Sequence, residues 1–179
     1  MDKQALRKRY RQERALMNPT AGDFSWTHIL SLPEFANAKV VASYNSYGDE
    51  PRTDDLNNEI LKYGKTLVLP KVLTDMSLEW IIWNGDNSNL VKKGNFFEPK
   101  GEPINESEID LVVIPSLHIN RAGYRLGQGG GSYDRALASM RAFRIGLIYT
   151  GEITNEEMHV EPHDQKLNAA ATPELIVRF

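Results

Sequence analysis

The chain has 179 residues, of which 41% are hydrophobic and 25% charged; its net charge is −3 and it contains no cysteine. This length predicts one domain over residues 1–179, the charge gives no basic footprint for nucleic acid, and the lack of cysteine excludes disulfides, thiol catalysis and cysteine-based metal sites. No apolar run approaches the roughly 20 residues of a membrane span, and the N-terminal segment lacks the apolar core of a signal peptide, so we expect a cytoplasmic protein without membrane or nucleic-acid partners.

The first half of the sequence predicts helices that alternate with strands. The predicted helices cover three segments: 2–17, 25–32 and 53–63. The predicted strands are 39–44, 66–69 and 78–83. Asp2 and Thr53 are suitable N-cap residues, whereas Gly64 and Pro70 are suitable terminators of a helix and a strand.

The second half continues this alternation. The segment 84–106 has a mixed composition with Gly, Asn and Pro, which predicts loops or short extensions. Apolar runs predict strands over 110–115, 144–149 and 174–177, and a helix is expected over 132–141.

Strands that alternate with helices predict an α/β fold, with a mostly parallel sheet that is covered on both faces. In such sheets ligands bind beyond the carboxyl ends of the strands. We therefore expect one rim to gather the loops that follow Tyr44, Leu69, Pro115 and Tyr149.

The segment 125–135, RLGQGGGSYDR, holds the strongest functional signal. A glycine cluster lets backbone N–H groups form a concave anion site, and a helix that starts at Ser132 would add the positive end of its dipole. Arg125 supplies a fork-shaped cation for phosphate, and Asp134 an oxygen ligand of the kind that Mg²⁺ prefers. The segment matches neither a P-loop nor a dinucleotide fingerprint, and a glycine run can also be a mobile surface turn.

Three other features each allow a functional and a structural interpretation. The helix over 2–17 is basic, with Lys3 and Arg7 on one face, but a solvated face is the default interpretation. Glu50 either serves the dipole of the next helix or is a functional carboxylate at a strand end. His159 and His163 are four residues apart, yet Pro162 interrupts any helix between them and no third ligand is evident, so zinc is not expected.

The glycine segment resembles that of the 5-formyltetrahydrofolate cyclo-ligase (methenyltetrahydrofolate synthetase) family, which carries RLGxGxGxYD. The resemblance extends over essentially the whole chain, in order and spacing. Its further elements are the K-x-x-x-R of Lys3 and Arg7, the strand and loop from Tyr44 through Glu50 to Thr53, Pro70, the IP-x-L of Ile114 to Leu117, and the element from Glu157 through Asp164 to Thr172.

The resemblance implies an enzyme that uses ATP and Mg²⁺ to convert 5-formyltetrahydrofolate to 5,10-methenyltetrahydrofolate, with ADP and phosphate as the other products. It also implies the three-layer α/β/α fold of sugar-phosphate isomerases and CoA transferases. Phosphoryl transfer would turn the formyl oxygen into a good leaving group before N10 closes the ring. We expect a monomer, with a dimer as the alternative.

The same resemblance implies roles for individual residues. Lys3, Arg125 and Tyr133 would be catalytic, and Asp134 and Asp164 would bind the metal. ATP would be bound by Lys3, Arg7, Arg125, Leu126, Gly127, Gln128, Gly129, Gly130, Gly131, Ser132 and Tyr133. The folate would be bound by Glu50, Asn45, Tyr44, Trp80 and Tyr133.

The chain departs from the family pattern at three positions. Ile119-Asn120 replaces a common Phe-Asp, Asn168 replaces a common Asp, and Ser116 replaces a common Gly. Two other functions remain open: a sugar-phosphate isomerase, which would need other acid and base residues and no ATP, and a non-catalytic nucleotide- or folate-binding sensor on the same fold.

Overall fold

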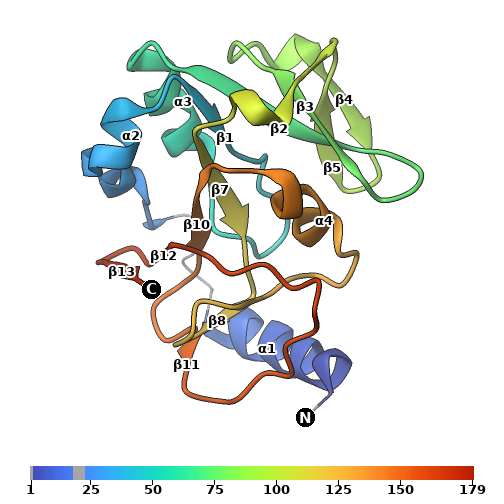
Figure 1. The fold of residues 1–179 in the computed structure, drawn as a ribbon, viewed down its shortest axis with the longest axis vertical. Helices are drawn as coiled ribbons and strands as arrows, with labels where there is room; N and C mark the ends of the chain where they lie inside the picture. Colours follow the sequence, from blue (N-terminus) through green and yellow to red (C-terminus); the bar gives the residue numbers. More distant parts are fainter. Residues whose placement is uncertain (1, 18–22) are drawn as a thin grey trace.

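The structure is a computed structural model, which describes residues 2–17 and 23–179. Its main sheet is formed by β1 (Val40–Ala42), β2 (Thr66–Val72), β3 (Leu78–Ile82), β6 (Pro103–Ile104), β7 (Leu111–Pro115), β10 (Phe143–Leu147), β12 (Ala169–Ala171) and β13 (Ile176–Arg178). Within the described residues the sheet has eight strands in the order β13-β12-β10-β7-β1-β2-β3-β6 (Figure 1). The neighbours from β12 to β2 are parallel, and antiparallel strands extend both edges. The expected mostly parallel sheet is confirmed.

The order of the parallel strands places a topological switch point between β1 and β7. From β1 the chain moves to one side to form β2, and it later returns to the other side to form β7 and then β10. Ligands of open α/β sheets bind at such a point, beyond the carboxyl ends of the two strands. Here those ends lead to the loop of Glu50 and to the chain that reaches the glycine segment.

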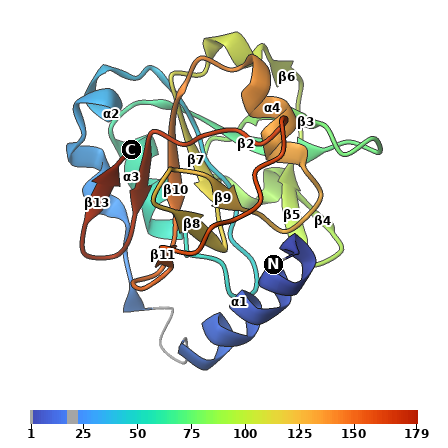
Figure 2. The same ribbon diagram turned by 60° about the horizontal axis from the view of Figure 1, so that its bottom comes forward.

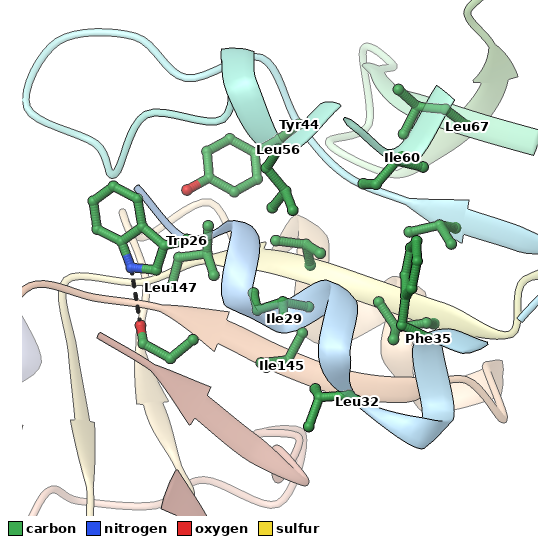
Figure 3. Packing of buried hydrophobic residues seen from close by; sticks show 14 of the residues in the cluster. Trp26, Ile29, Leu32, Phe35, Tyr44, Leu56, Ile60, Leu67, Ile145 and Leu147 are labelled. Carbon is green, nitrogen blue, oxygen red and sulfur yellow. Dashed lines mark hydrogen bonds between the residues drawn. The ribbon is translucent and has the colours of Figure 1, made fainter. Parts of the chain in front are cut away.

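Helices cover both faces of this sheet, because its strands are apolar on both sides. One face packs against the 3₁₀ helix η2 (Thr27–Ser31), α2 (Pro33–Asn37) and α3 (Asp54–Lys62); Figure 3 shows Trp26, Ile29, Phe35 and Leu56 in this layer. The Trp26 indole N–H donates to the carbonyl oxygen of Ala171 at 3.2 Å. The opposite face packs against α4 (Ser132–Ser139) through residues such as Leu137.

The first helix, α1 (Lys3–Met17), belongs to neither layer. It lies beside a small sheet in the order β11-β8-β9, made of β11 (Ile153–Thr154), β8 (His118–Asn120) and β9 (Arg125–Leu126) (Figures 1 and 2). Tyr10 of α1 stacks on His118 with 3.4 Å between ring centroids. None of the described helices combines the length and apolarity that crossing a membrane requires.

Several predicted elements differ from the observed ones. The helix expected over 25–32 is instead η2 followed by α2, because Leu32 precedes Pro33 and adopts an extended conformation. β2 continues through Pro70, since β1 ends opposite Val68 and no ladder bond to β1 is required of the proline.

The segment 84–106 is more ordered than its composition predicts. It contains a hairpin of β4 (Leu90–Lys93) and β5 (Phe96–Pro99), together with β6 and the 3₁₀ helices η3 (Asn87–Asn89) and η4 (Glu106–Glu108). The predicted helix over 132–141 ends earlier, at Ser139.

Candidate active site at the carboxyl edge of the sheet

The basic side chains of α1 lie along the glycine segment. Lys3, Arg7, Arg11 and Arg14 follow one another at spacings of four, four and three, so they share one helix face. Arg7 Nε donates to the Gly127 carbonyl at 2.9 Å, and Arg11 Nη2 donates to Gln128 Oε1 at 2.6 Å. The default interpretation of a solvated face is therefore wrong for this face.

Arg14 fixes α1 to the end of β7. It forms a bidentate pair with Glu152, with Nε–Oε1 and Nη2–Oε2 distances of 2.7 and 2.6 Å, and the two side chains are 3% and 1% exposed. Its Nη2 also donates to the carbonyls of Ser116 at 2.7 Å and Leu117 at 3.1 Å. Burial raises the pKa of Glu152, and the hydrogen bonds from Arg14 oppose that rise.

Arg125 folds back over the start of the glycine segment. Its Nη2 donates to Asp134 Oδ2 at 3.0 Å, and its guanidinium lies 5.5 Å from the centre of the Tyr133 ring. A Cβ on Gly127 would lie 2.4 Å from Arg125 Nη1, so the arginine requires glycine at this position. Gly129 and Gly131 have φ angles of 112° and 66°, which glycine adopts without strain.

The two predicted metal ligands, Asp134 and Asp164, are linked through Gln165. Asp134 Oδ1 accepts the backbone N–H of Gln165 at 3.1 Å, and Gln165 follows Asp164 in the chain. Lys3 Nζ lies 2.6 Å from Asp164 Oδ2 and 2.7 Å from Glu161 Oε2. Although burial raises the pKa of Asp164, hydrogen bonds from Lys3 and the Glu161 backbone lower it below its usual value.

Asp164 is also grouped with His163, for which the sequence suggested no further ligand, and with Glu161, which the sequence analysis did not name. One ligand atom each from Glu161, His163 and Asp164 lies within 4.8 Å of the others. This group offers two carboxylates and one imidazole at the protein surface, next to the ammonium group of Lys3.

Glu50 is a buried residue that follows an exposed turn, Tyr47 to Asp49, between β1 and α3. It is 7% exposed, and Tyr47 supplies the backbone N–H that donates to its Oε2 at 3.1 Å. Burial raises the pKa of Glu50 to about 7, although the Tyr47 hydrogen bond and the charge of Arg14 oppose that rise. The first turn of α3 carries Asp54 and Asp55 instead, so the helix-dipole interpretation of Glu50 is not supported.

The loop of Glu50 is held by backbone-directed hydrogen bonds. Thr53 Oγ1 donates to the Tyr44 carbonyl at 2.5 Å, and Asn57 Nδ2 donates to the same oxygen at 3.0 Å. Thr53 precedes α3 as predicted, but its side chain fixes this loop and caps no helix N–H. Tyr149 Oη donates to the carbonyl of Glu50 at 3.1 Å.

Tyr133 is a partly buried residue at the end of the glycine segment, and the charge of Glu50 affects the pKa of its phenol. Burial raises the pKa of its phenol, and the nearby charge of Glu50 raises it further. Trp80 lies in the core below, with its ring centroid 6.2 Å from that of Tyr133. Among the described residues, Asn45 Nδ2, Trp80 Nε1 and Arg125 Nε are buried without a hydrogen-bond partner. Buried polar atoms of residues outside the predicted site, such as Ser43 and His118, also lack a hydrogen-bond partner, so this property alone does not mark the site.

The positions that depart from the family pattern serve the backbone. Asn120 Oδ1 accepts the N–H groups of Ala122 and Tyr124 at 3.1 and 2.9 Å, and Asn168 Oδ1 accepts that of Arg144 at 2.8 Å. The Ser116 carbonyl accepts from Arg14, as described above. Asn120 and Ser116 thus hold the chain between β7 and the glycine segment, whereas Asn168 holds the start of β10, at the opposite edge of the sheet.

Sequence reasoning missed four of the residues that organise this edge: Arg11, Arg14, Tyr149 and Glu152. The helical spacing from Lys3 and Arg7 could have identified the two arginines. Glu152 and Tyr149 carry no comparable signal, because their partners are far away in the sequence.

A separate groove of about 590 Å³ lies between η2 and α3, away from the predicted site residues. It is an open polar surface, lined for example by His28, Asp55 and Lys62, and shares none of the predicted site residues. The carboxyl edge therefore remains the better candidate site.

The whole chain is similar to known proteins. The model of the 5-formyltetrahydrofolate cyclo-ligase family matches residues 1–173. The chain is 28% identical to a probable 5-formyltetrahydrofolate cyclo-ligase of Schizosaccharomyces pombe over 84% of this chain and 82% of the relative. It is 27% identical to the 5-formyltetrahydrofolate cyclo-ligase of Escherichia coli K12 over 91% and 96%.

Two solved structures are similar. The NMR structure of 5,10-methenyltetrahydrofolate synthetase from Aquifex aeolicus superimposes with a TM-score of 0.82 at 28% identity, covering 99% of this chain and 93% of the other. The corresponding protein from Mycoplasma pneumoniae gives a TM-score of 0.75 at 26% identity, with coverages of 95% and 98%.

The environment of Glu50 predicts a specific pH dependence of stability. Between its ordinary pKa of 4.5 and its folded value of about 7, the folded protein keeps a proton that the unfolded chain releases. The free energy of unfolding therefore falls as pH rises through this window, by at most about 1.4 kcal/mol per pH unit from this group. Glu50→Gln should remove that slope in urea unfolding between pH 4.5 and 8. The exposed Glu102→Gln should keep it, and an unchanged slope in Glu50→Gln would contradict the assigned pKa.

The glycine segment provides a matched pair of substitutions. In Gly127→Ala the new Cβ displaces the buried Arg125 guanidinium, whereas in Gly130→Ala it meets only the flexible Met76 Cε, at 2.7 Å. We expect Gly127→Ala to lose about 1–3 kcal/mol of stability in urea unfolding, as overpacked sites do, and Gly130→Ala clearly less. Equal losses would show that Arg125 does not dictate the glycine.

Proposed function

Because the chain belongs to the 5-formyltetrahydrofolate cyclo-ligase family, whose model matches residues 1–173, we propose that it converts 5-formyltetrahydrofolate to 5,10-methenyltetrahydrofolate, with ATP converted to ADP and phosphate. One observation carries the assignment to this edge. A cationic helix lies along the glycine segment, and the buried carboxyl group of Glu50 interacts with Tyr133 at the end of that same segment.

In this proposal the ATP phosphates bind between α1 and the glycine segment. Lys3, Arg7 and Arg125 would neutralise phosphate charge, and the first turn of α4 would add its positive dipole end. The backbone of the segment would cradle the phosphates through Leu126, Gly127, Gln128, Gly129, Gly130, Gly131, Ser132 and Tyr133. The docking of α1 on this segment, with Arg7 and Arg11 bonded to it, supports the arrangement.

Asp134 and Asp164 fit a Mg²⁺ site by their chemistry, since both offer hard carboxylate oxygens at the ATP side. Each carboxylate is neutralised by a phosphate-binding cation, Arg125 for Asp134 and Lys3 for Asp164. Asp134 and Asp164 would hold the metal, which would neutralise charge on the phosphate groups. Glu161 would be a further oxygen donor beside Asp164.

The folate would bind on the Glu50 side. The N–H edge of the pterin ring offers hydrogen-bond donors, which suit a carboxylate. Ionised Glu50 would accept hydrogen bonds from this edge. Asn45 and Trp80 carry unpaired N–H groups, and Tyr44 completes the wall. Tyr133, between the two halves, would contact both substrates.

The chemistry needs positioning more than reactive side chains. The formyl oxygen attacks the γ-phosphorus and ADP leaves, which gives an imidophosphate-like intermediate. N10 then attacks the activated carbon and loses its proton to solvent, the C–O bond breaks and phosphate leaves. Lys3, Arg125 and Tyr133 would hold the transferred group, since such transfers are catalysed mainly by alignment and charge neutralisation.

The proposal takes residues 1–179 as one domain with the three-layer α/β/α fold of sugar-phosphate isomerases and CoA transferases. The helices on both faces of a mostly parallel sheet support this relation. We further propose that it works as a monomer in the cytoplasm.

The decisive test is product formation by the purified protein. Mixed with 5-formyltetrahydrofolate, ATP and Mg²⁺, it should produce the near-ultraviolet absorbance of methenyltetrahydrofolate, and omission of any component should abolish the signal. A folded protein that binds ATP or folate but yields no product would instead be a sensor.

The two halves of the site predict a split in kinetic constants. Arg125→Ala should raise the KM for ATP roughly 10- to 100-fold, the value of a lost charged hydrogen bond, with a smaller effect on folate. Glu50→Gln should raise the KM for folate more than that for ATP. Arg178→Gln, which breaks an exposed bidentate pair with Glu34, is the control and should change neither. Equal effects of the first two variants on both substrates would contradict the division.

A further inference from the structure

We propose that Arg14 is a positioning residue of the folate half-site: held by Glu152, it fixes Tyr149 and thereby the loop that presents Glu50. This inference rests on the proposed function, because it assigns to Arg14 a part in the reaction that Glu50 serves. It extends that function by linking the docking of α1 to the geometry of the folate side.

A continuous set of contacts leads from Arg14 to Glu50. Glu152 accepts two hydrogen bonds from Arg14, and its Oε2 also accepts the backbone N–H of Tyr149 at 2.8 Å. The Arg14 guanidinium lies 5.3 Å from the centre of the Tyr149 ring. Tyr149 Oη in turn donates to the carbonyl of Glu50 at 3.1 Å. Each of these side chains is almost fully buried, so none can turn without disturbing the next.

Arg14 also contacts the chain that leads to the proposed ATP half of the site. Its two carbonyl contacts, at Ser116 and Leu117, hold the chain that leads from β7 to β8 and on to the glycine segment. Lys3 and Arg7 lie on the same helix face and reach the proposed phosphate site. A single guanidinium therefore contacts the segments that follow β7 and β10, and Tyr149 carries the connection on to Glu50.

The charge of Arg14 acts on Glu50 as well. Burial raises the pKa of the Glu50 carboxyl, and the Arg14 charge lowers it. The other titratable and charged groups that face Glu50 or its tyrosine neighbours are Tyr44, Tyr47, Tyr133, Tyr149, Arg11 and Arg125. Neither Tyr47 nor Tyr133 is charged at physiological pH, because burial raises the pKa of each phenol. Arg11 lowers the pKa of Tyr47, and Arg125 lowers the pKa of Tyr133.

Stability alone does not explain such a pair. Desolvating two charges is costly, and replacing a buried ion pair by apolar side chains is often neutral or stabilising. A buried bidentate pair does fix orientation, because the guanidinium fork matches a carboxylate in one geometry. The arrangement therefore suits a positioning role.

The test compares pH profiles of kcat/KM for 5-formyltetrahydrofolate at saturating ATP. Folate binding to ionised Glu50 gives the profile an acid limb. Arg14→Gln should move this limb to higher pH and lower kcat/KM roughly tenfold, since small misplacements of a positioned group cost up to about 100-fold. Glu152→Gln should move it to lower pH, because the Arg14 charge is then no longer neutralised. Arg14→Lys should restore the wild-type position of the limb.

Three further variants or readouts separate positioning from folding. Tyr149→Phe should raise the folate KM without moving the limb, and Arg178→Gln, which breaks an exposed pair of the same chemistry, should leave the profile unchanged. If Arg14→Gln fails to fold, the opposite shift in Glu152→Gln carries the test. The Glu50 carboxyl ¹³C shift, titrated by NMR in ligand-free protein, should move in the same two directions.

A purely structural role predicts a different result. Arg14→Gln and Glu152→Gln would then lose stability and raise both KM values together, while the limb and the ¹³C titration of Glu50 stay at the wild-type pH; this outcome would overturn the inference. A wild-type protein without ligase activity would refute the proposed function alone, because the ¹³C titration still reads the link between Arg14 and Glu50.

Discussion

The buried pair of Arg14 and Glu152 is the contact on which the carboxyl edge depends. Helix α1 packs on neither face of the main sheet, so the hydrophobic layers do not determine where it lies. Arg14 supplies that position by binding a carboxylate after β10 and two carbonyls after β7. Once α1 is fixed there, its helical spacing brings Arg7 and Arg11 to the glycine segment and Lys3 to Glu161 and Asp164.

The two halves of the candidate site differ in the charged side chains that they contain. The glycine side gathers cations and pairs them with carboxylates, as in Arg125 with Asp134 and Lys3 with Asp164. The Glu50 side instead holds one carboxyl group among tyrosines, where desolvation keeps its pKa near 7. One half is thus suited to a highly charged group and the other to a neutral ring with N–H donors, and Tyr133 lies where they meet.

The sequence predicts those parts of the fold whose signal is local. The apolar runs of β1, β7 and β10 and the glycine segment are recognisable because each contains its own pattern. β12 escapes prediction since Ala169–Ala171 has small side chains with little strand preference, although all three residues are fully buried. The hairpin of β4 and β5 escapes because each strand has only four residues, and the apolar pairs Leu90-Val91 and Phe96-Phe97 lack the alternation of a half-buried strand.

The candidate site follows the same division. Lys3, Arg7, Arg125 and Asp134 stand in short motifs and could be named in advance. Glu152 and Tyr149 acquire their roles only through contacts with residues 138 and 99 positions away, which no local pattern encodes. Thr53 shows the converse: its position before a helix suggests a cap, but a tertiary contact with Tyr44 takes its hydroxyl.

Helix α1 has a small apolar cluster of its own, formed by Leu6 and Tyr10 with Leu126 and Met158. Apart from this cluster it is held by polar contacts, so it can open as a local cooperative unit while the main sheet stays folded. A ligand that binds both α1 and the glycine segment stabilises the closed state of this unit by mass action. If the ATP phosphates bind here as proposed, their binding sets the opening equilibrium of α1, and we expect the amide protons of α1 to exchange by a route separate from those of the core.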